Sequence, residues 1–134
     1  MHLRTLIAAP FLLAILTAGS GATSGDRAVA ARQSAVVNLT EPTLIGGIIV
    51  QGPVLFVHDD ATTGPCTAVY LFEPSKGPCK EIAAFHCIPA ARRIVDKFTV
   101  RMRPNSMGFG WVLTEFQFAR ETEGHGVPIP ADVH

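Results

Sequence analysis

The sequence lacks the features that mark nucleic-acid-binding proteins and the commonest enzyme classes. Its longest run of basic residues is the pair Arg92-Arg93, and eleven lysines and arginines balance eleven aspartates and glutamates. Nucleic acids and anionic membrane surfaces require a basic patch, which this composition does not supply. The chain also contains no nucleophile elbow, no glycine-rich phosphate loop and no metalloprotease helix. We therefore expect no nucleic-acid partner, and the sequence favours a protein that is not an enzyme.

Cysteine is scarce, and none of the three cysteines occurs before Cys66. This absence excludes a lipid anchor on a cysteine shortly after a signal sequence. The apolar run over residues 5–18 follows a single arginine and precedes small residues, a pattern typical of a secretory signal peptide. The run is shorter than the roughly 20 apolar residues that a membrane-spanning helix needs. We expect a signal peptide over residues 1–22, cleaved after Ala22 or alternatively after Ala30, with export to the periplasm or the exterior and no membrane span after cleavage.

Helical periodicity is nearly absent, whereas short apolar segments alternate with turn residues along the chain. Segments of this kind at regular intervals favour an all-β sandwich or open barrel. The sequence predicts one small antiparallel domain over residues 35–120 with six to seven strands, between a flexible leader over 23–34 and an extended C-terminal tail over 121–134. One short helix is expected near 89–97, where Pro89 suits a first helical position. The strands are expected at residues 35–39, 44–50, 54–58, 66–72, 82–88, 98–103 and 111–119.

Two of the cysteines bound a predicted hairpin. Folding residues 66–72 back onto 82–87 places Cys66 opposite Cys87. Opposed residues of antiparallel strands have Cβ atoms about 4.5–5.5 Å apart, slightly wider than a disulfide prefers. Since export would permit such a bond, we expect a Cys66–Cys87 disulfide, with Cys79 left as a free thiol. A change of register by one residue would, on this prediction, separate the two sulfurs.

The same residues allow an alternative interpretation, a zinc or copper site. His58 ends the segment that precedes Cys66, and His86 adjoins Cys87; thiolates and imidazoles suit both metals. Neighbouring residues of a strand face opposite sides, so His86 and Cys87 enter one site only if a bulge intervenes. No C-x-x-C or H-x-x-x-H spacing supports the site. The disulfide is therefore the favoured interpretation, and a metal site of His58, Cys66, Cys87 and His86 is the alternative.

Three segments resemble those of short, uncharacterised secreted bacterial proteins: residues 52–60 (GPVLFVHDD), 65–70 (PCTAVY) and 85–89 (FHCIP). The resemblance extends from about Val36 to Pro128. It implies a signal peptide followed by one compact domain, and it implies no activity.

The expected function is accordingly that of an exported, non-catalytic binding or assembly module, braced by a disulfide and needing no cofactor. Its partner would be a protein or a small ligand. Self-association has two routes. One is the apolar segment 44–50, interrupted by Gly46-Gly47, which is predicted as a bent central strand but would need cover at a sheet edge. The other is an intermolecular bridge through Cys79. The alternative function is that of a small secreted protein binding zinc or copper.

Overall fold

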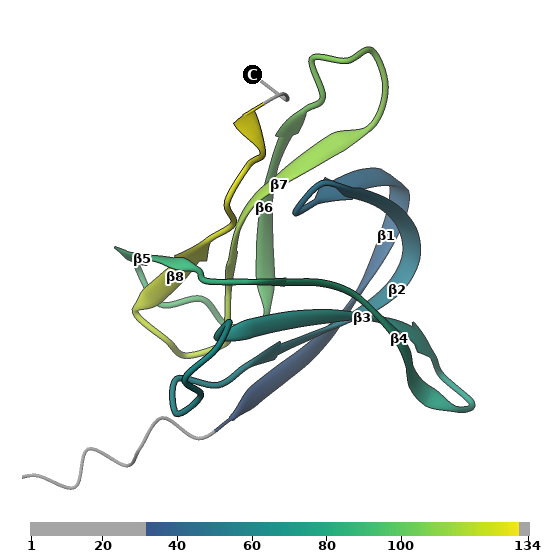
Figure 1. The fold of residues 1–134 in the computed structure, drawn as a ribbon. Helices are drawn as coiled ribbons and strands as arrows, with labels where there is room; N and C mark the ends of the chain where they lie inside the picture. The colour runs from purple at the N-terminus through teal and green to yellow at the C-terminus, as the bar shows by residue number, and fades with distance from the viewer. Residues whose placement is uncertain (1–31, 132–134) are drawn as a thin grey trace, which may run out of the picture.

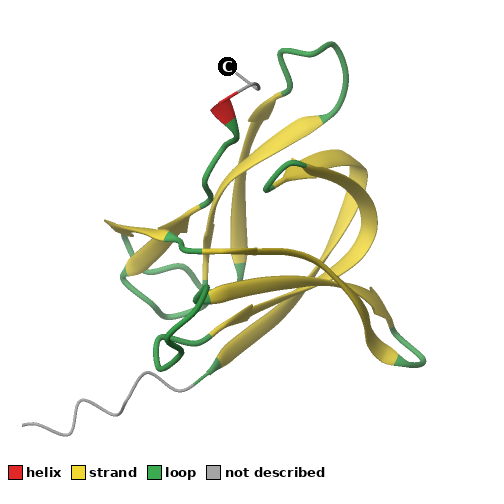
Figure 2. Cartoon of the chain, viewed as in Figure 1, coloured by secondary structure: helices red, strands yellow, loops and turns green. Residues whose placement is uncertain are grey.

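A computed structural model describes residues 32–131 of the chain, which form one curled, mostly antiparallel sheet in the shape of a half-barrel (Figure 1). The described residues contain no α-helix, and a short helical turn at Ala131 is their one helical element (Figure 2). The predicted all-β fold of the open-barrel type is therefore confirmed. The signal peptide predicted over residues 1–22 lies outside the described residues, as does most of the predicted leader, and Gln33 and Ser34 already belong to the first strand.

Within residues 32–131, no helix is long and apolar enough to cross a membrane.

Eight strands make up the sheet, rather than the six to seven expected. Along the sheet their order is β4-β3-β2-β1-β7-β8-β5, and β6 pairs with β7 outside this path. All pairings are antiparallel except a parallel contact of two residues between β1 and β7. The strand bounds are β1 (Gln33–Ile45), β2 (Ile48–His58), β3 (Thr67–Glu73), β4 (Gly77–Phe85), β5 (Ile88–Ala91), β6 (Thr99–Pro104), β7 (Trp111–Gln117) and β8 (Glu123–Gly126).

The hydrophobic core joins the first four strands to the last four. Val54 and Phe56 of β2 and Val69 of β3 pack in one cluster with Leu113 and Phe116 of β7. The rings of Phe56 and Phe116 lie 5.1 Å apart, centroid to centroid, in a tilted arrangement. Aromatic pairs of this kind contribute about 0.5–1.5 kcal/mol beyond the area that they bury. The alternation of side chains along β2 and β3 therefore fixes which residues face the core.

The predicted strand over residues 44–50 is wrong. Gly46 and Gly47 form a tight turn with φ angles of +56° and +95°, and this turn joins β1 to β2. Two successive residues with positive φ are what a two-residue hairpin turn of type I′ requires, and glycine adopts such angles without steric cost. The apolar residues on either side therefore belong to two paired strands.

The helix predicted near 89–97 is also wrong. Its first residues lie in β5, which pairs antiparallel with β8, so that Pro89 faces His125. A nine-residue helix is marginal in water, and pairing with a distant strand prevails over the local preference. Proline is tolerated in β5 because this strand lies at an edge of the sheet. The partner strand β8 comes from the segment that was predicted to lie outside the β-domain.

Candidate functional site

Two histidines and two cysteines meet where the two ends of the curled sheet approach each other. His58 is the last residue of β2, Cys66 immediately precedes β3, Cys87 lies between β4 and β5, and His125 lies in β8. We refer to these four residues as the Cys-His cluster. Because the inward-facing positions of β2 continue from Phe56 to His58, the alternation of that strand directs the imidazole into the interior.

The potential ligand atoms of the Cys-His cluster lie within a few ångströms of one another. The two sulfurs are 3.1 Å apart, and the Cys87 sulfur lies 3.5 Å from Nδ1 of His125 and 3.9 Å from Nδ1 of His58. The imidazole rings of His58 and His125 are 4.2 Å apart, centroid to centroid. Bond lengths to zinc of about 2.0–2.3 Å would place tetrahedral ligand atoms about 3.3–3.8 Å apart. The three distances to the Cys87 sulfur lie within roughly half an ångström of that range. The ligand atoms of His58, Cys66 and Cys87 all lie within 4.8 Å of one another, and His125 lies beside this group.

The two cysteines are free thiols in this structure, because 3.1 Å is longer than the S–S bond of about 2.05 Å. The predicted hairpin register is wrong by one residue, since Thr67 pairs with Phe85 rather than with His86. The sequence analysis expected such a change of register to separate the two sulfurs, but they remain 3.1 Å apart. Cys66 and Cys87 both lie beyond the last pair of the ladder, where the chain is free to turn, and the sulfurs still meet.

His58 is held in one orientation by partners on both ring nitrogens. Its Nε2 lies 2.8 Å from Oδ1 of Asp60, and its Nδ1 lies 3.0 Å from the hydroxyl of Thr67. With the Nε2 proton donated to the Asp60 carboxylate, Nδ1 is unprotonated, and its lone pair can accept the hydrogen bond of the Thr67 hydroxyl or bind a metal on the side of Cys87. A carboxylate on the second ring nitrogen is the usual partner of a metal-binding histidine. The side chain itself is only 3% exposed.

The loop between β2 and β3 keeps Cys66 beside His58. The backbone N–H of Asp59 donates to the carbonyl of Cys66 at 2.8 Å, which closes the loop at its base. Within it, the Asp59 carboxylate accepts the N–H of Ala61, and the Thr62 hydroxyl accepts the N–H of Gly64. The loop is therefore ordered by its own polar side chains.

His125 completes the cluster from the far half of the sheet. It is 3% exposed and stacks on Phe116, with ring centroids 5.0 Å apart. Burial, followed by the neighbouring His58, lowers the pKa of His125 to about 4, so its ring is neutral at neutral pH. Neutral imidazole is the form that binds metals. The neighbouring Gly124 allows β8 to pair closely with β7, since a Cβ at position 124 would collide with the Glu115 carboxylate.

The sulfurs differ in their surroundings. Burial, together with the neighbouring Cys66 sulfur, raises the pKa of the Cys87 thiol to about 12. The Cys66 sulfur accepts a hydrogen bond from the backbone N–H of Cys87 at 3.4 Å. A bound cation would favour the thiolate form of both residues, because metal ligation requires deprotonated sulfur.

The structure brings together three of the four residues of the predicted metal site and leaves out the fourth. His86 is exposed and points away from the Cys-His cluster, as expected for the neighbour of Cys87 in an extended chain. Cys79 is exposed in β4, with its sulfur 3.4 Å from the carbonyl of Gly77. The sequence analysis missed His125, because no local pattern in the tail indicates the pairing of β8 with β7 and β5.

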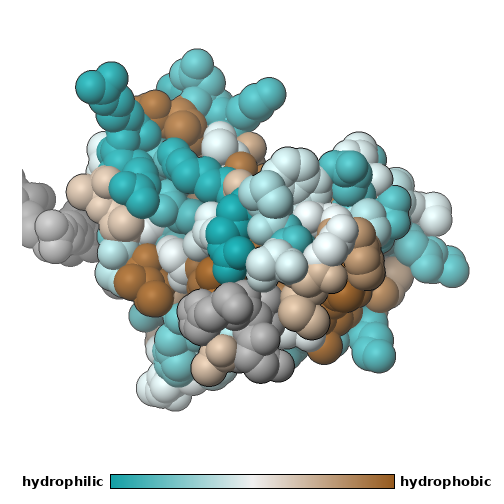
Figure 3. All heavy atoms as spheres, turned by 90° about the horizontal axis from the view of Figure 1, so that it is seen from above, coloured by the Kyte–Doolittle hydropathy of each residue, from teal (hydrophilic) through white to brown (hydrophobic). Residues whose placement is uncertain are grey.

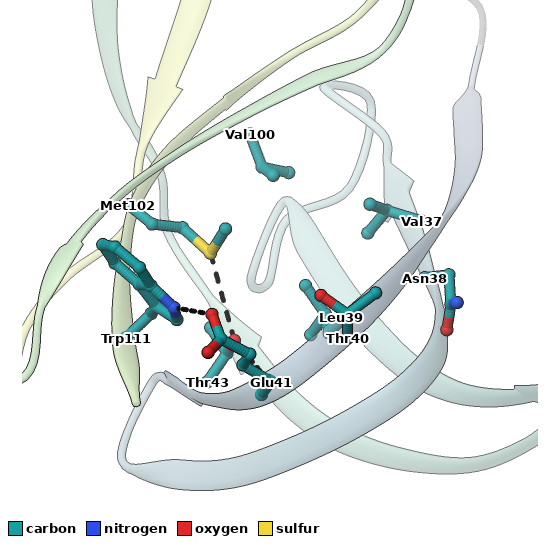
Figure 4. Close-up of a pocket in the computed structure, with 9 residues that line it drawn as sticks. All are labelled: Val37, Asn38, Leu39, Thr40, Glu41, Thr43, Val100, Met102 and Trp111. Atoms are coloured by element: carbon teal, nitrogen blue, oxygen red, sulfur yellow. Dashed lines mark hydrogen bonds between the residues drawn. The ribbon is translucent and has the colours of Figure 1, made fainter. Parts of the chain in front are cut away.

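A second feature, a pocket of about 80 Å³, lies between β1 and the β6–β7 hairpin (Figure 4). Trp111 donates its indole N–H to the Glu41 carboxylate at its rim, and the Thr43 hydroxyl lies 3.9 Å from the sulfur of Met102. Sites for organic ligands usually measure about 300–1,000 Å³, so this pocket is too small for one. On the face shown in Figure 3, apolar areas are separate and lie among polar ones.

The Cys-His cluster is therefore the candidate functional site of residues 32–131, and three of its members, His58, Cys66 and Cys87, have metal-ligating atoms within 4.8 Å of one another. No protein-family model, no curated protein and no solved structure matches the chain.

Proposed function

We propose that this protein is a small exported metal-binding protein that holds one zinc or copper ion in the Cys-His cluster. The single observation that carries the proposal is the group of His58, Cys66 and Cys87, whose ligand atoms all lie within 4.8 Å of one another, with His125 beside it at 3.5 Å from the Cys87 sulfur. Two thiolates and two imidazoles form a donor set that suits zinc and copper. Export to the periplasm or exterior is supported by the apolar run near the start of the sequence.

The arrangement supports a structural metal rather than a catalytic one. Four protein ligands fill a tetrahedral site, whereas catalytic zinc sites keep one position for water or substrate. The Asp60 carboxylate orients His58, and the Cys87 N–H donates to the Cys66 sulfur, so two of the four ligands have supporting hydrogen bonds. The ion would join ligands from β2 and the residue before β3 to ligands from the β4–β5 connection and from β8.

The second candidate is an exported binding or assembly module without a cofactor, braced by a Cys66–Cys87 disulfide. The observation that favours it is the short distance of 3.1 Å between the sulfurs, below the ligand spacing of a tetrahedral site. Its partner would be a protein, a small ligand or a second copy of the chain. Self-association is supported by two exposed apolar residues after the first hairpin turn, Ile48 and Ile49, and by the exposed Cys79.

Elemental analysis of the native protein, combined with its intact mass after alkylation under denaturing conditions, tests the proposal. We expect about one zinc or copper ion per chain and three alkylated cysteines after chelation. Substituting His125→Ala should remove the metal, because its ring adjoins the Cys87 sulfur. Cys79→Ser and His86→Ala should retain the metal, because both side chains are exposed away from the cluster. A protein without metal and with Cys79 as its one alkylated cysteine would establish the second candidate instead.

A further inference from the structure

Cys66 lies between the buried Cys-His cluster and a pocket open to solvent. The pocket has a volume of about 160 Å³ and is lined by Val57, Ala68 and Tyr70, by the polar loop after β2, and by Cys66 itself. Val57 and Ala68 lie on the face of the sheet opposite to His58 and Thr67, because they alternate with them along β2 and β3. The lining includes none of the other members of the cluster. Of the four residues of the cluster, a small molecule in this pocket would therefore contact Cys66 alone.

The two sulfurs are also poised to bond to each other. They lie 3.1 Å apart, and they come from segments that lie outside the β3–β4 ladder, so that closing the remaining ångström does not break a strand pairing. The Cys66 sulfur accepts a hydrogen bond from the backbone N–H of Cys87, and this hydrogen bond stabilises negative charge on the Cys66 sulfur. Both sulfurs are also ligands in the proposed metal site, and a sulfur bound in a disulfide no longer provides a thiolate for the metal.

We propose that Cys66 and Cys87 are a redox pair whose oxidation by peroxide expels the metal ion, with Cys66 as the sulfur that reacts first. This inference rests on the proposed function. An electron pair of the Cys66 thiolate attacks one oxygen of hydrogen peroxide, the O–O bond breaks, and the hydroxide that leaves takes a proton to become water. The product at Cys66 is a sulfenic acid.

The second step closes the disulfide. The Cys87 thiolate attacks the Cys66 sulfur, the S–O bond breaks, and the departing hydroxide takes a second proton to become water. Both sulfurs are oxidised, one peroxide is reduced to two waters, and a zinc ion keeps its charge throughout. The ion then retains only His58 and His125 from the cluster, which is too few ligands for a tetrahedral site, and dissociates.

The metal-release step can be tested with zinc, which has no redox chemistry of its own. The Cys79→Ser chain is loaded with zinc and treated with hydrogen peroxide, while a chromogenic chelator measures released zinc and intact mass measures disulfide formation. We expect one zinc ion released for each disulfide formed, and recovery of zinc binding after a thiol reductant. Zinc retained after the disulfide has formed, or zinc released without a disulfide, would overturn the inference. A chain that binds neither zinc nor copper before peroxide is added fails the proposed function instead.

The order of reaction is tested on the same protein without metal. Substoichiometric peroxide is added together with a trap for sulfenic acid, and peptide mapping locates the trapped cysteine. We expect the trap on Cys66 roughly ten times more often than on Cys87, because Cys66 lines the open pocket and Cys87 does not. The variants Cys66→Ser and Cys87→Ser, each in the Cys79→Ser chain, give the two rates separately. Trapping at Cys87 first would refute the role assigned to Cys66.

Discussion

His125 reaches the cysteine pair from a strand that lies far from it in sequence, and its ring lies within 3.5 Å of the Cys87 sulfur. We expect His125→Ala to weaken zinc binding by a factor of about 100 or more, since even the partners of ligands contribute about 10–100-fold. The matched control is His86→Ala, which removes an exposed imidazole next to Cys87. Competition with a chelator of known affinity measures both. Equal affinities of the two variants would remove His125 from the site.

Asp60 binds no metal in our proposal and acts by positioning His58, to whose Nε2 it lies 2.8 Å away. Asp60→Asn should lower zinc affinity by about 10–100-fold while leaving the stoichiometry at one ion. The neighbouring Asp59 provides the control, because its carboxylate accepts a loop N–H and Asp59→Asn can do the same. If the two variants bind zinc with the same affinity, the carboxylate does not orient the ligand.

At this scale the sequence identified His58, Cys66 and Cys87 as neighbours, because two turns connect the segments that carry them. It could not identify His125. The four residues Glu123–Gly126 have no apolar alternation of their own, and they become a strand only by pairing with β5 and β7. It wrongly kept His86 in the alternative metal site, although adjacent residues in an extended chain face opposite ways and His86 is exposed.

Among the elements, β6, β7 and the segment after β5 are tied together by one carboxylate. Glu115 of β7 is 6% exposed and accepts hydrogen bonds from Arg92 at 2.8 and 2.6 Å and from Arg101 at 2.7 Å. The hydrogen bond from Arg92, with the charges of both arginines, lowers the pKa of Glu115 below its usual 4.5. Its contribution to stability is therefore present above about pH 4.5 and is lost as pH falls through the lower folded-state pKa.

We expect Glu115→Gln to lower the free energy of unfolding by about 1.5–3 kcal/mol near neutral pH, the usual range for hydrogen bonds to a charged group. The difference from the unsubstituted chain should shrink as pH falls below 4.5 and through the lower folded-state pKa, where the carboxylate becomes protonated. Urea unfolding at a series of pH values measures it. Glu73→Gln is the control, because Glu73 pairs with Lys76 on the surface and should change stability by under about 0.5 kcal/mol. A pH-independent difference would contradict the assigned role.

The elements themselves were largely predictable, since strands and turns alternate visibly along the chain. One error occurred where long-range pairing decides the structure, and the other at a local hairpin turn. Residues 89–97 carry a local helix preference, but β5 pairs with β8. The segment around Gly46 and Gly47 is apolar throughout, and apolar content alone does not distinguish a bent strand from the two ends of a hairpin. The alternation of apolar segments and turns is enough to predict the fold class. The order of the strands depends on pairings between distant segments, such as β5 with β8, which this alternation does not reveal.

The molecule as a whole consists of two halves, β1–β4 and β5–β8, whose strand pairing with each other is short. In residues 32–131 it is limited to Thr43 with Trp111 and Leu44 with Val112, at one end of β1. Elsewhere the two halves contact each other through the shared core and the Cys-His cluster. The cluster lies at the opposite end of β1, where Gln33 pairs with His58. A metal ion bound there would link the halves at the end where strand pairing does not.

Zinc should therefore stabilise the whole domain, and not only the loops that bind it. With free zinc at a hundred times its dissociation constant, mass action adds about 2.7 kcal/mol to the free energy of unfolding. We expect one cooperative transition, followed by near-ultraviolet circular dichroism, that moves to higher urea with zinc and does not move in His125→Ala, because that variant lacks the ligand from the second half. A transition that splits in two, with only one part responding to zinc, would show instead that the ion stabilises a single half and that the shared core alone holds the two together.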